Sequence, residues 1–292
     1  MFFVRGCLCL SVFSGLSVLV RVLLLALALA AVAPLSHAEH IWDLEAVDSN
    51  GAGTHPKVGA PPGADPANSP NRVVISGIAL NSPAELVDTS MQWQAYVQGE
   101  SPGNGGIAAW AGIFYNPAWP RFPSDILPGD RIQIDGFIED HNGKVNITER
   151  HSAAPGMQFT VTKLASGAGM PAPETIPCVA ACNFFDQTRA TGGEKYQARW
   201  CKLSNARIVS GEWGAGNSIV ITDDNVATMT LLLSSQGDFN SHSAPAETFS
   251  VTGIFDQEDT EFPCTSAYRL WVRKYSDINL APASARDWEC YE

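Results

Sequence analysis

The sequence lacks the residue patterns by which many catalytic and metal sites are recognised. It contains no His-Glu-x-x-His motif and no Gly-rich loop that ends in Lys-Ser or Lys-Thr, and we expect no strand-to-helix serine elbow. The histidines that follow residue 38 are never three or four residues apart and never adjoin a cysteine, which argues against a zinc site or a haem attachment signal. We therefore expect a protein that is not an enzyme and holds no metal or cofactor.

Positive charge is also scarce. The chain has 18 lysines and arginines against 30 aspartates and glutamates, which gives a formal net charge of −12. Residues 71–166 carry six basic and nine acidic residues, and residues 198–280 carry six and ten. Neither region has the basic excess of a groove that follows a phosphate backbone, so the charge disfavours nucleic acid as the ligand.

Only one long apolar run occurs, and it lies close to the N-terminus. Arg5 and Arg21 precede the apolar stretch 22–34, and Ser36-His37-Ala38 forms a small-x-small cleavage site before Glu39. We interpret residues 1–38 as a signal peptide and expect an exported protein, periplasmic or extracellular, whose mature chain is not inserted in a membrane. Since all acidic residues follow residue 38, the formal net charge of that chain is −14.

The cysteines are few and odd in number once the leader is removed. Cys7 and Cys9 leave with it, and five remain: Cys178, Cys182, Cys201, Cys264 and Cys290. Export favours disulfides, and we expect the pairs Cys178–Cys182 and Cys264–Cys290. Cys201 occupies an inward position of an alternating strand, so we expect it to be a buried free thiol.

Helical periodicity is almost absent, whereas strand alternation recurs and one pattern occurs twice. Residues 132–140 read IQIDGFIED and residues 249–257 read FSVTGIFDQ, so each is an alternating strand interrupted by a glycine that would let it bend at a barrel corner. Strands are predicted over 73–80, 91–98, 109–115, 131–140, 144–149, 158–164, 198–209, 218–222, 228–234, 248–257 and 268–278. The pattern predicts an all-β protein with two copies of one small five-stranded barrel.

Composition divides the chain further. Residues 39–70 combine an apolar segment with a Gly- and Pro-rich linker, residues 167–197 form a junction rich in Pro, Gly and Cys, and residues 281–292 form a tail, so the two barrels fall at 71–166 and 198–280. The apolar segment around Ile41 could add a strand to another subunit and so build a homo-oligomer, but we favour packing on its own barrel.

Five strands per unit, a glycine bend in the fourth strand and Gly77 in the first match the OB-fold. Together with WQAYVQ, PGDRIQIDGFIED and YRLWVRKYSDI, these features make residues 71–280 resemble the paired OB-fold modules of secreted bacterial proteins, which often precede extracellular nuclease or phosphoesterase domains. The resemblance implies two tandem OB-fold-like barrels. Here we expect no catalytic domain.

The OB-fold resemblance directs attention to strands 2 and 3, where such barrels bind extended polymers. If Trp93, Ala95 and Val97 face the core, then Gln94, Tyr96 and Gln98 face outward, and we expect Trp110 and Phe114 to lie beside them as a stacking platform. The alternative, which we favour slightly, is that the proline-rich loop with Trp119 and Phe122 covers these rings.

A second candidate surface lies on the last strand of the second unit. There Arg269, Trp271 and Arg273 alternate onto one face, which could bind a polyanion. We favour the interpretation that this is a solvated edge strand whose charges prevent aggregation.

Two acidic groups could carry other chemistry. Asp256, Glu258, Asp259 and Glu261 could bind calcium or act as an acid and base pair, although we favour a solvated loop. The stretch 223–225, Asp-Asp-Asn, favours a hairpin turn.

We hypothesise an exported, non-catalytic binding or assembly protein that recognises a glycan, a protein partner or itself. The alternative is an extracytoplasmic single-stranded nucleic-acid-binding protein or nuclease accessory, and a hydrolase built on Asp256 and Glu258 is the least favoured class.

Overall fold

The computed structural model describes residues 38–280 except 89, 91, 102, 113–121, 224 and 225. Among these residues no helix is both long enough and apolar enough to span a membrane. Helices are short: α2 covers Ile41–Leu44 and α3 Val179–Cys182. Single turns of 3-10 helix are η1 Pro66–Asn68, η2 Gly193–Lys195, η3 Phe239–Ser241 and η4 Tyr275–Asp277.

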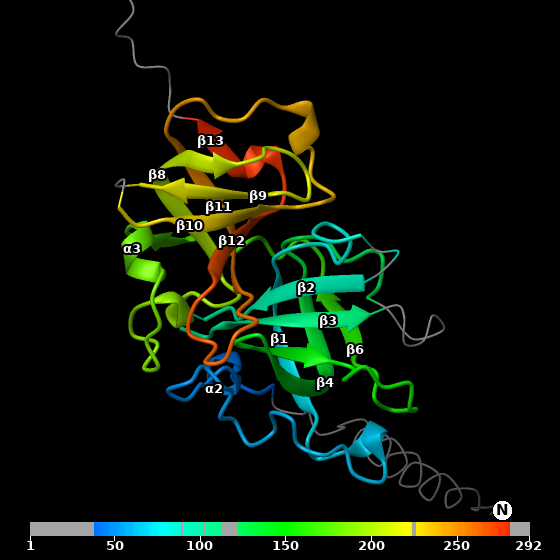
Figure 1. The fold of residues 1–292 in the computed structure, drawn as a ribbon. Coiled ribbons are helices and arrows are strands. Elements are labelled where there is room, and N and C mark those ends of the chain that lie inside the picture. Colours follow the sequence, from blue (N-terminus) through cyan, green and yellow to red (C-terminus); the bar gives the residue numbers. More distant parts are fainter. Residues whose placement is uncertain are drawn as a thin grey trace, which may run out of the picture. The chain divides into compact units, whose positions relative to one another are not determined.

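The first barrel is built from six strands (Figure 1). They are β1 Val73–Ala79, β2 Gln92–Gln98, β3 Gly106–Gly112, β4 Arg131–His141, β5 Lys144–Thr148 and β6 Thr160–Ala165. The order β1-β2-β3-β5-β4 closes through the pairing of β4 with β1, and β6 is added to β4. Within the ring β3 and β5 are parallel and all other pairs are antiparallel.

The second barrel repeats this topology. Its strands are β7 Glu174–Ile176, β8 Trp200–Gly211, β9 Ser218–Thr222, β10 Met229–Leu233, β11 Phe249–Gln257, β12 Tyr268–Val272 and β13 Ile278–Leu280. The ring β8-β9-β10-β12-β11 closes through β11 and β8, again with one parallel pair, β10 and β12. The prediction of an all-β protein with two tandem OB-fold-like, five-stranded barrels is confirmed.

The two repeated glycines occupy equivalent places in the two barrels. Up to Gly136, β4 pairs with β1, and beyond it with β5; around Gly253, β11 likewise passes from β8 to β12. A Cβ at Gly136 would lie 2.7 Å from atoms of Ile147 and Phe159, and one at Gly253 would lie 2.7 Å from the carbonyl oxygen of Trp271. Glycine therefore permits the close approach that the bend requires.

Two short strands were not predicted. β7 lies in the junction 167–197, where composition favours neither strand nor helix, and it pairs in parallel with β8. The predicted strand 268–278 ends at Val272, and η4 separates it from β13, which pairs with β11.

Each barrel has its own apolar core, and a third cluster joins them. It contains Leu80, Leu86, Val87, Tyr96, Ala108, Ala198, Trp200, Ile254 and Trp271. The Tyr96 and Trp271 rings meet edge to face with centroids 6.2 Å apart. The Trp200 backbone N–H donates to Gln98 Oε1 at 2.8 Å. The outer face of β2 is thus partly covered by the second barrel.

The segment that precedes the first barrel packs onto its own chain, as a helical turn and not as a strand. Ile41 and Leu44 of α2 are buried in the core of the first barrel. The Arg189 guanidinium lies over the Trp42 ring, 4.0 Å from its centroid. The Glu39 N–H donates to the carbonyl oxygen of Val74 at 2.7 Å.

The described cysteines differ from the expected pairing. Cys178, Cys182, Cys201 and Cys264 are free thiols, while Cys290 lies outside the described residues. Cys182 faces the core of the second barrel, where its Sγ is 3.7 Å from Met229 Sδ, whereas Cys178 precedes α3 and is half-buried. Cys201 is buried, as predicted.

Candidate functional site

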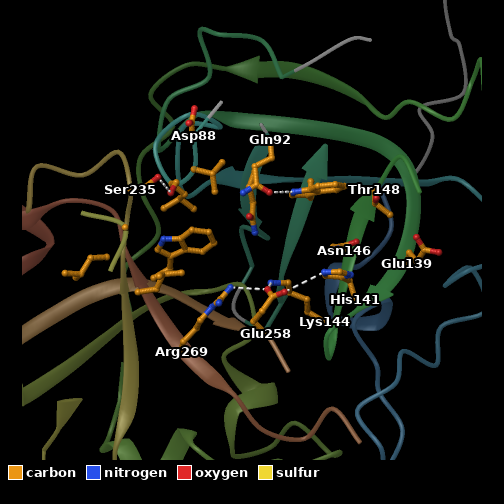
Figure 2. A pocket seen from close by; sticks show the side chains of 18 of the residues that line it. Asp88, Gln92, Glu139, His141, Lys144, Asn146, Thr148, Ser235, Glu258 and Arg269 are labelled. Atoms are coloured by element: carbon orange, nitrogen blue, oxygen red, sulfur yellow. Dashed lines mark hydrogen bonds and ion pairs between the residues drawn. The ribbon is translucent and has the colours of Figure 1, made fainter. Parts of the chain in front are cut away.

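A cavity of about 540 Å³ opens between the two barrels (Figure 2). Strands β2, β3, β4 and β5 contribute lining residues from the first barrel, as does the loop after β1, and β10 and β12 contribute them from the second. It is lined by Leu86, Val87, Asp88, Gln92, Gln94, Trp110, Glu139, His141, Lys144, Asn146, Thr148, His151, Gly216, Leu232, Leu233, Ser235, Glu258, Arg269 and Trp271. A volume of this size is typical of sites for small organic groups.

Strand alternation places the amides on this wall. Ala95 and Val97 are buried in the first barrel's core, so Gln92 and Gln94 project from the opposite face of β2. Trp110 pairs with Gln94 across β2 and β3, and its ring remains half-exposed. The centroids of the Trp110 and His151 rings are 5.1 Å apart. The wall therefore combines an aromatic face with two amides.

Hydrogen bonds fix both amides. Trp110 Nε1–H donates to Gln92 Oε1 at 2.8 Å. Gln94 Nε2 donates to the Tyr96 hydroxyl at 2.7 Å, below the cavity wall. Tyr96 is fully buried, and its ring contacts Trp271 of the second barrel.

An ion-pair network joins the barrels at the base of the cavity. Lys144 Nζ lies 2.9 Å from Asp256 Oδ1 and 2.8 Å from Glu258 Oε2. Arg269 lies 2.6 Å from Asp256 Oδ2 and 3.1 Å from Glu258 Oε2. Figure 2 shows His141 beside the same Glu258 carboxylate, with 3.6 Å between Nε2 and Oε1. Lys144 and Arg269 are thus both neutralised by carboxylates.

The network keeps its acids ionised. Burial raises the pKa of Asp256, but the charges of Lys144 and Arg269 outweigh it and lower the pKa below its usual value. For Glu258, the nearby His141 ring and the hydrogen bonds from Lys144 and Asn142 likewise outweigh burial, and the pKa is lowered. Neither carboxyl holds a proton near neutral pH, so neither is a general acid there.

The residues predicted as a stacking platform have different fates. Gln94 and Trp110 line the cavity together, whereas Tyr96 is buried beneath it and Gln98 is used to hold Trp200. Phe114 and Trp119 lie outside the described residues, and Phe122 is buried. The prediction that Tyr96 faces away from its own core is correct, but the second barrel covers it.

The interpretation of the last strand as a solvated edge is wrong. β12 lies between β10 and β11, and the face that carries Arg269 and Trp271 lines the cavity. Arg273 is buried, donates to the Leu80 carbonyl oxygen at 2.8 Å and bonds Asp277 at 3.1 Å. It is therefore a structural contact between barrels.

The interpretation of the acidic cluster as a solvated loop is also wrong in part. Asp256 lies within β11 and is 1% exposed, and Asp259 is buried, with its carboxylate accepting from the Ser266 N–H at 2.8 Å. Among the described residues no three His, Cys, Asp or Glu side chains are arranged to hold a metal. In the stretch 223–225, Asp223 Oδ2 accepts from the Val179 N–H at 2.9 Å, and the other two residues lie outside the described part.

The cavity residues missed at the sequence level include Gln92, Lys144 and Asn146. Gln92 lies two residues before Gln94 and therefore on the same face of the strand, so the sequence could have identified it. Lys144 and Asn146 alternate on β5 with the core residues Val145 and Ile147, so alternation places them on the outer face. It does not show that the second barrel covers this face, where Lys144 bonds Asp256.

One catalytic pattern does occur in the chain. Residues 99–103, GESPG, match Gly-x-Ser-x-Gly. They lie in the turn between β2 and β3, and the exposed Ser101 is followed by a strand and not by a helix. This is not the strand-to-helix elbow that exposes a nucleophile.

Comparison with known proteins adds no relative: the sequence matches no protein-family model and no curated protein.

Proposed function

We propose that this chain is an exported, non-catalytic binding protein, built like the paired OB-fold modules that it resembles, and that it binds a neutral glycan in the cavity between its barrels. The observation that carries the proposal is the partly exposed Trp110, which lies opposite Gln94 on the neighbouring strand and is hydrogen-bonded to Gln92. An aromatic face flanked by amides suits a sugar ring, which has an apolar face and a polar edge.

The charges of the cavity favour a neutral ligand over a polyanion. Among the described residues, Lys144 and Arg269 are the lysine and arginine that line it, and both are ion-paired to Asp256 and Glu258. Asp88 and Glu139 add further negative charge to the lining. A phosphate would have to displace these carboxylates, which disfavours the nucleic-acid alternative.

The same ion pairs support a non-catalytic role. Asp256 and Glu258, the pair considered for acid and base catalysis, are engaged by cations and have lowered pKa values. A glycosidase of the common type needs one carboxyl that is protonated near neutral pH.

Isothermal titration with neutral oligosaccharides of glucose, mannose and galactose tests the proposal, with single-stranded DNA titrated in parallel at low and high salt. We expect binding of at least one oligosaccharide and none of DNA. Trp110→Ala should weaken that binding roughly tenfold, or by about 1.4 kcal/mol. Phe262→Ala, which removes a ring that is 76% exposed and outside the cavity, is the control. Salt-sensitive DNA binding without sugar binding would replace the proposal with the nucleic-acid alternative.

A further inference from the structure

The orientation of both cavity amides follows from their hydrogen-bond partners. An indole N–H can only donate, so the atom of Gln92 that meets Trp110 Nε1 is the amide oxygen. The Gln92 Nε2 group, with its two N–H donors, has no partner among the described residues and belongs to a side chain that lines the cavity. Gln92 therefore offers a donor to a ligand (Figure 2).

Gln94 is held the opposite way round. Its Nε2 group donates to the Tyr96 hydroxyl oxygen at 2.7 Å, and an amide nitrogen can only donate. Gln94 Oε1 is left without a partner among the described residues and offers an acceptor.

The donor and the acceptor are neighbours. Residues two apart on a strand project from the same face about 6.5 Å apart. A sugar hydroxyl can donate to the Gln94 amide oxygen or accept from the Gln92 amide nitrogen. An ether oxygen or a fluorine atom cannot donate. The pair thus matches the polar edge of a sugar ring that carries several free hydroxyls.

We infer that Tyr96 is a positioning residue that holds the Gln94 side chain with its amide oxygen toward the ligand, an inference that rests on the proposed function. The cavity then selects sugars whose ring carries a free hydroxyl group that can donate to Gln94 Oε1. A ligand with the same shape but no donor at that position leaves a buried acceptor unpaired, and this loss supplies the selectivity.

Deoxyfluoro sugars test the inference, because fluorine replaces a hydroxyl with little change in size but cannot donate. The probes are disaccharides of glucose, mannose and galactose and their forms fluorinated at one position at a time, titrated calorimetrically. At one ring position of a binding sugar we expect at least tenfold weaker binding of the fluorinated form. In Tyr96→Phe the Gln94 amide can rotate and present its N–H groups. The ratio of the dissociation constants of the fluorinated and the parent sugar should therefore fall below about threefold.

Two variants make the result specific. Tyr268→Phe removes another buried tyrosine hydroxyl, one that donates to Glu194 at 2.7 Å outside the cavity, and should leave the ratio unchanged. Gln94→Met leaves the Tyr96 hydroxyl in place and should also abolish the ratio, which covers the case in which Tyr96→Phe fails to fold.

The outcomes separate the two proposals. If the wild-type protein binds sugars but shows no preference at any position, or if Gln94→Met weakens both forms equally, the inference is wrong and glycan binding stands. If no disaccharide or oligosaccharide binds, the proposed function itself fails.

Discussion

Lys144 of the first barrel and Asp256 of the second form a buried ion pair, 2.9 Å between Nζ and Oδ1, with side chains only 6% and 1% exposed. Removal of both charges from water is costly, and the mutual attraction offsets this cost only while both partners are present. The pair therefore makes the contact between the barrels specific, because a displaced partner would leave a buried charge uncompensated.

We expect Lys144→Met to lower the free energy of unfolding by about 3 kcal/mol, at the low end for a broken buried pair because Arg269 still neutralises Asp256. Urea denaturation at neutral pH measures the change. Lys202→Met is the control: Lys202 is a half-exposed lysine of β8 with no ion pair among the described residues, and its loss should cost less than about 0.5 kcal/mol. Equal losses in the two variants would show that the pair contributes nothing.

A buried carboxyl predicts a pH dependence of stability. Burial raises the pKa of Glu194 from 4.5 to about 7, against the lowering effects of the Tyr268 hydrogen bond and the Arg189 charge. Because the folded pKa is the higher one, the stabilisation by this group is fully present below about pH 4.5 and is lost as the pH rises to about 7. The loss amounts to roughly 3 kcal/mol.

Glu194→Gln should therefore match the wild type near pH 4 and exceed its stability by roughly 3 kcal/mol at pH 8, as measured by urea denaturation at the two values. Some slope will remain in the variant, because burial also raises the pKa of the neighbouring Glu45. Glu212→Gln, at an exposed position, should reproduce the wild-type pH dependence. A variant no more stable than wild type at pH 8 would contradict the assignment.

Local signals were sufficient for most of the fold. Alternation located eleven of the thirteen described strands, all except β7 and β13. The glycine repeat identified Gly136 and Gly253 as equivalent bends. Period-two spacing also showed that Gln94 and Tyr96 face away from the first core. These properties depend on residues within a few positions of one another.

The covering of that face by the second barrel could not be predicted in this way. Lys144 and Asp256 are 112 positions apart, and nothing near either residue in the sequence marks it as a partner of the other. β12 was interpreted as an edge strand because its parallel pairing with β10 joins strands that are separated by the whole of β11. Half of the candidate site was therefore visible only in the tertiary structure.

The segment before the first barrel should behave as part of its core. Leu44 of α2 is fully buried, so Leu44→Ala should lower the free energy of unfolding by about 3 kcal/mol through the cavity that it leaves. Asp43→Ala, one residue earlier with a side chain that is 71% exposed, should change it by less than about 0.5 kcal/mol. If the segment served only to join other subunits, the isolated monomer would not distinguish the two variants.

Thiol reactivity tests the arrangement of the cysteines. The thiolate is the reactive form, and burial raises the pKa of Cys182 to about 12 and that of Cys201 well above its usual value. In the native protein at pH 8, iodoacetamide should modify the half-buried Cys178 much faster than either, and all three should react at similar rates in urea. Peptide mass analysis identifies the modified sites. A Cys178–Cys182 disulfide peptide from protein purified without reductant would restore the pairing expected from the sequence, because it would require Cys182 to turn away from Met229 and out of the core.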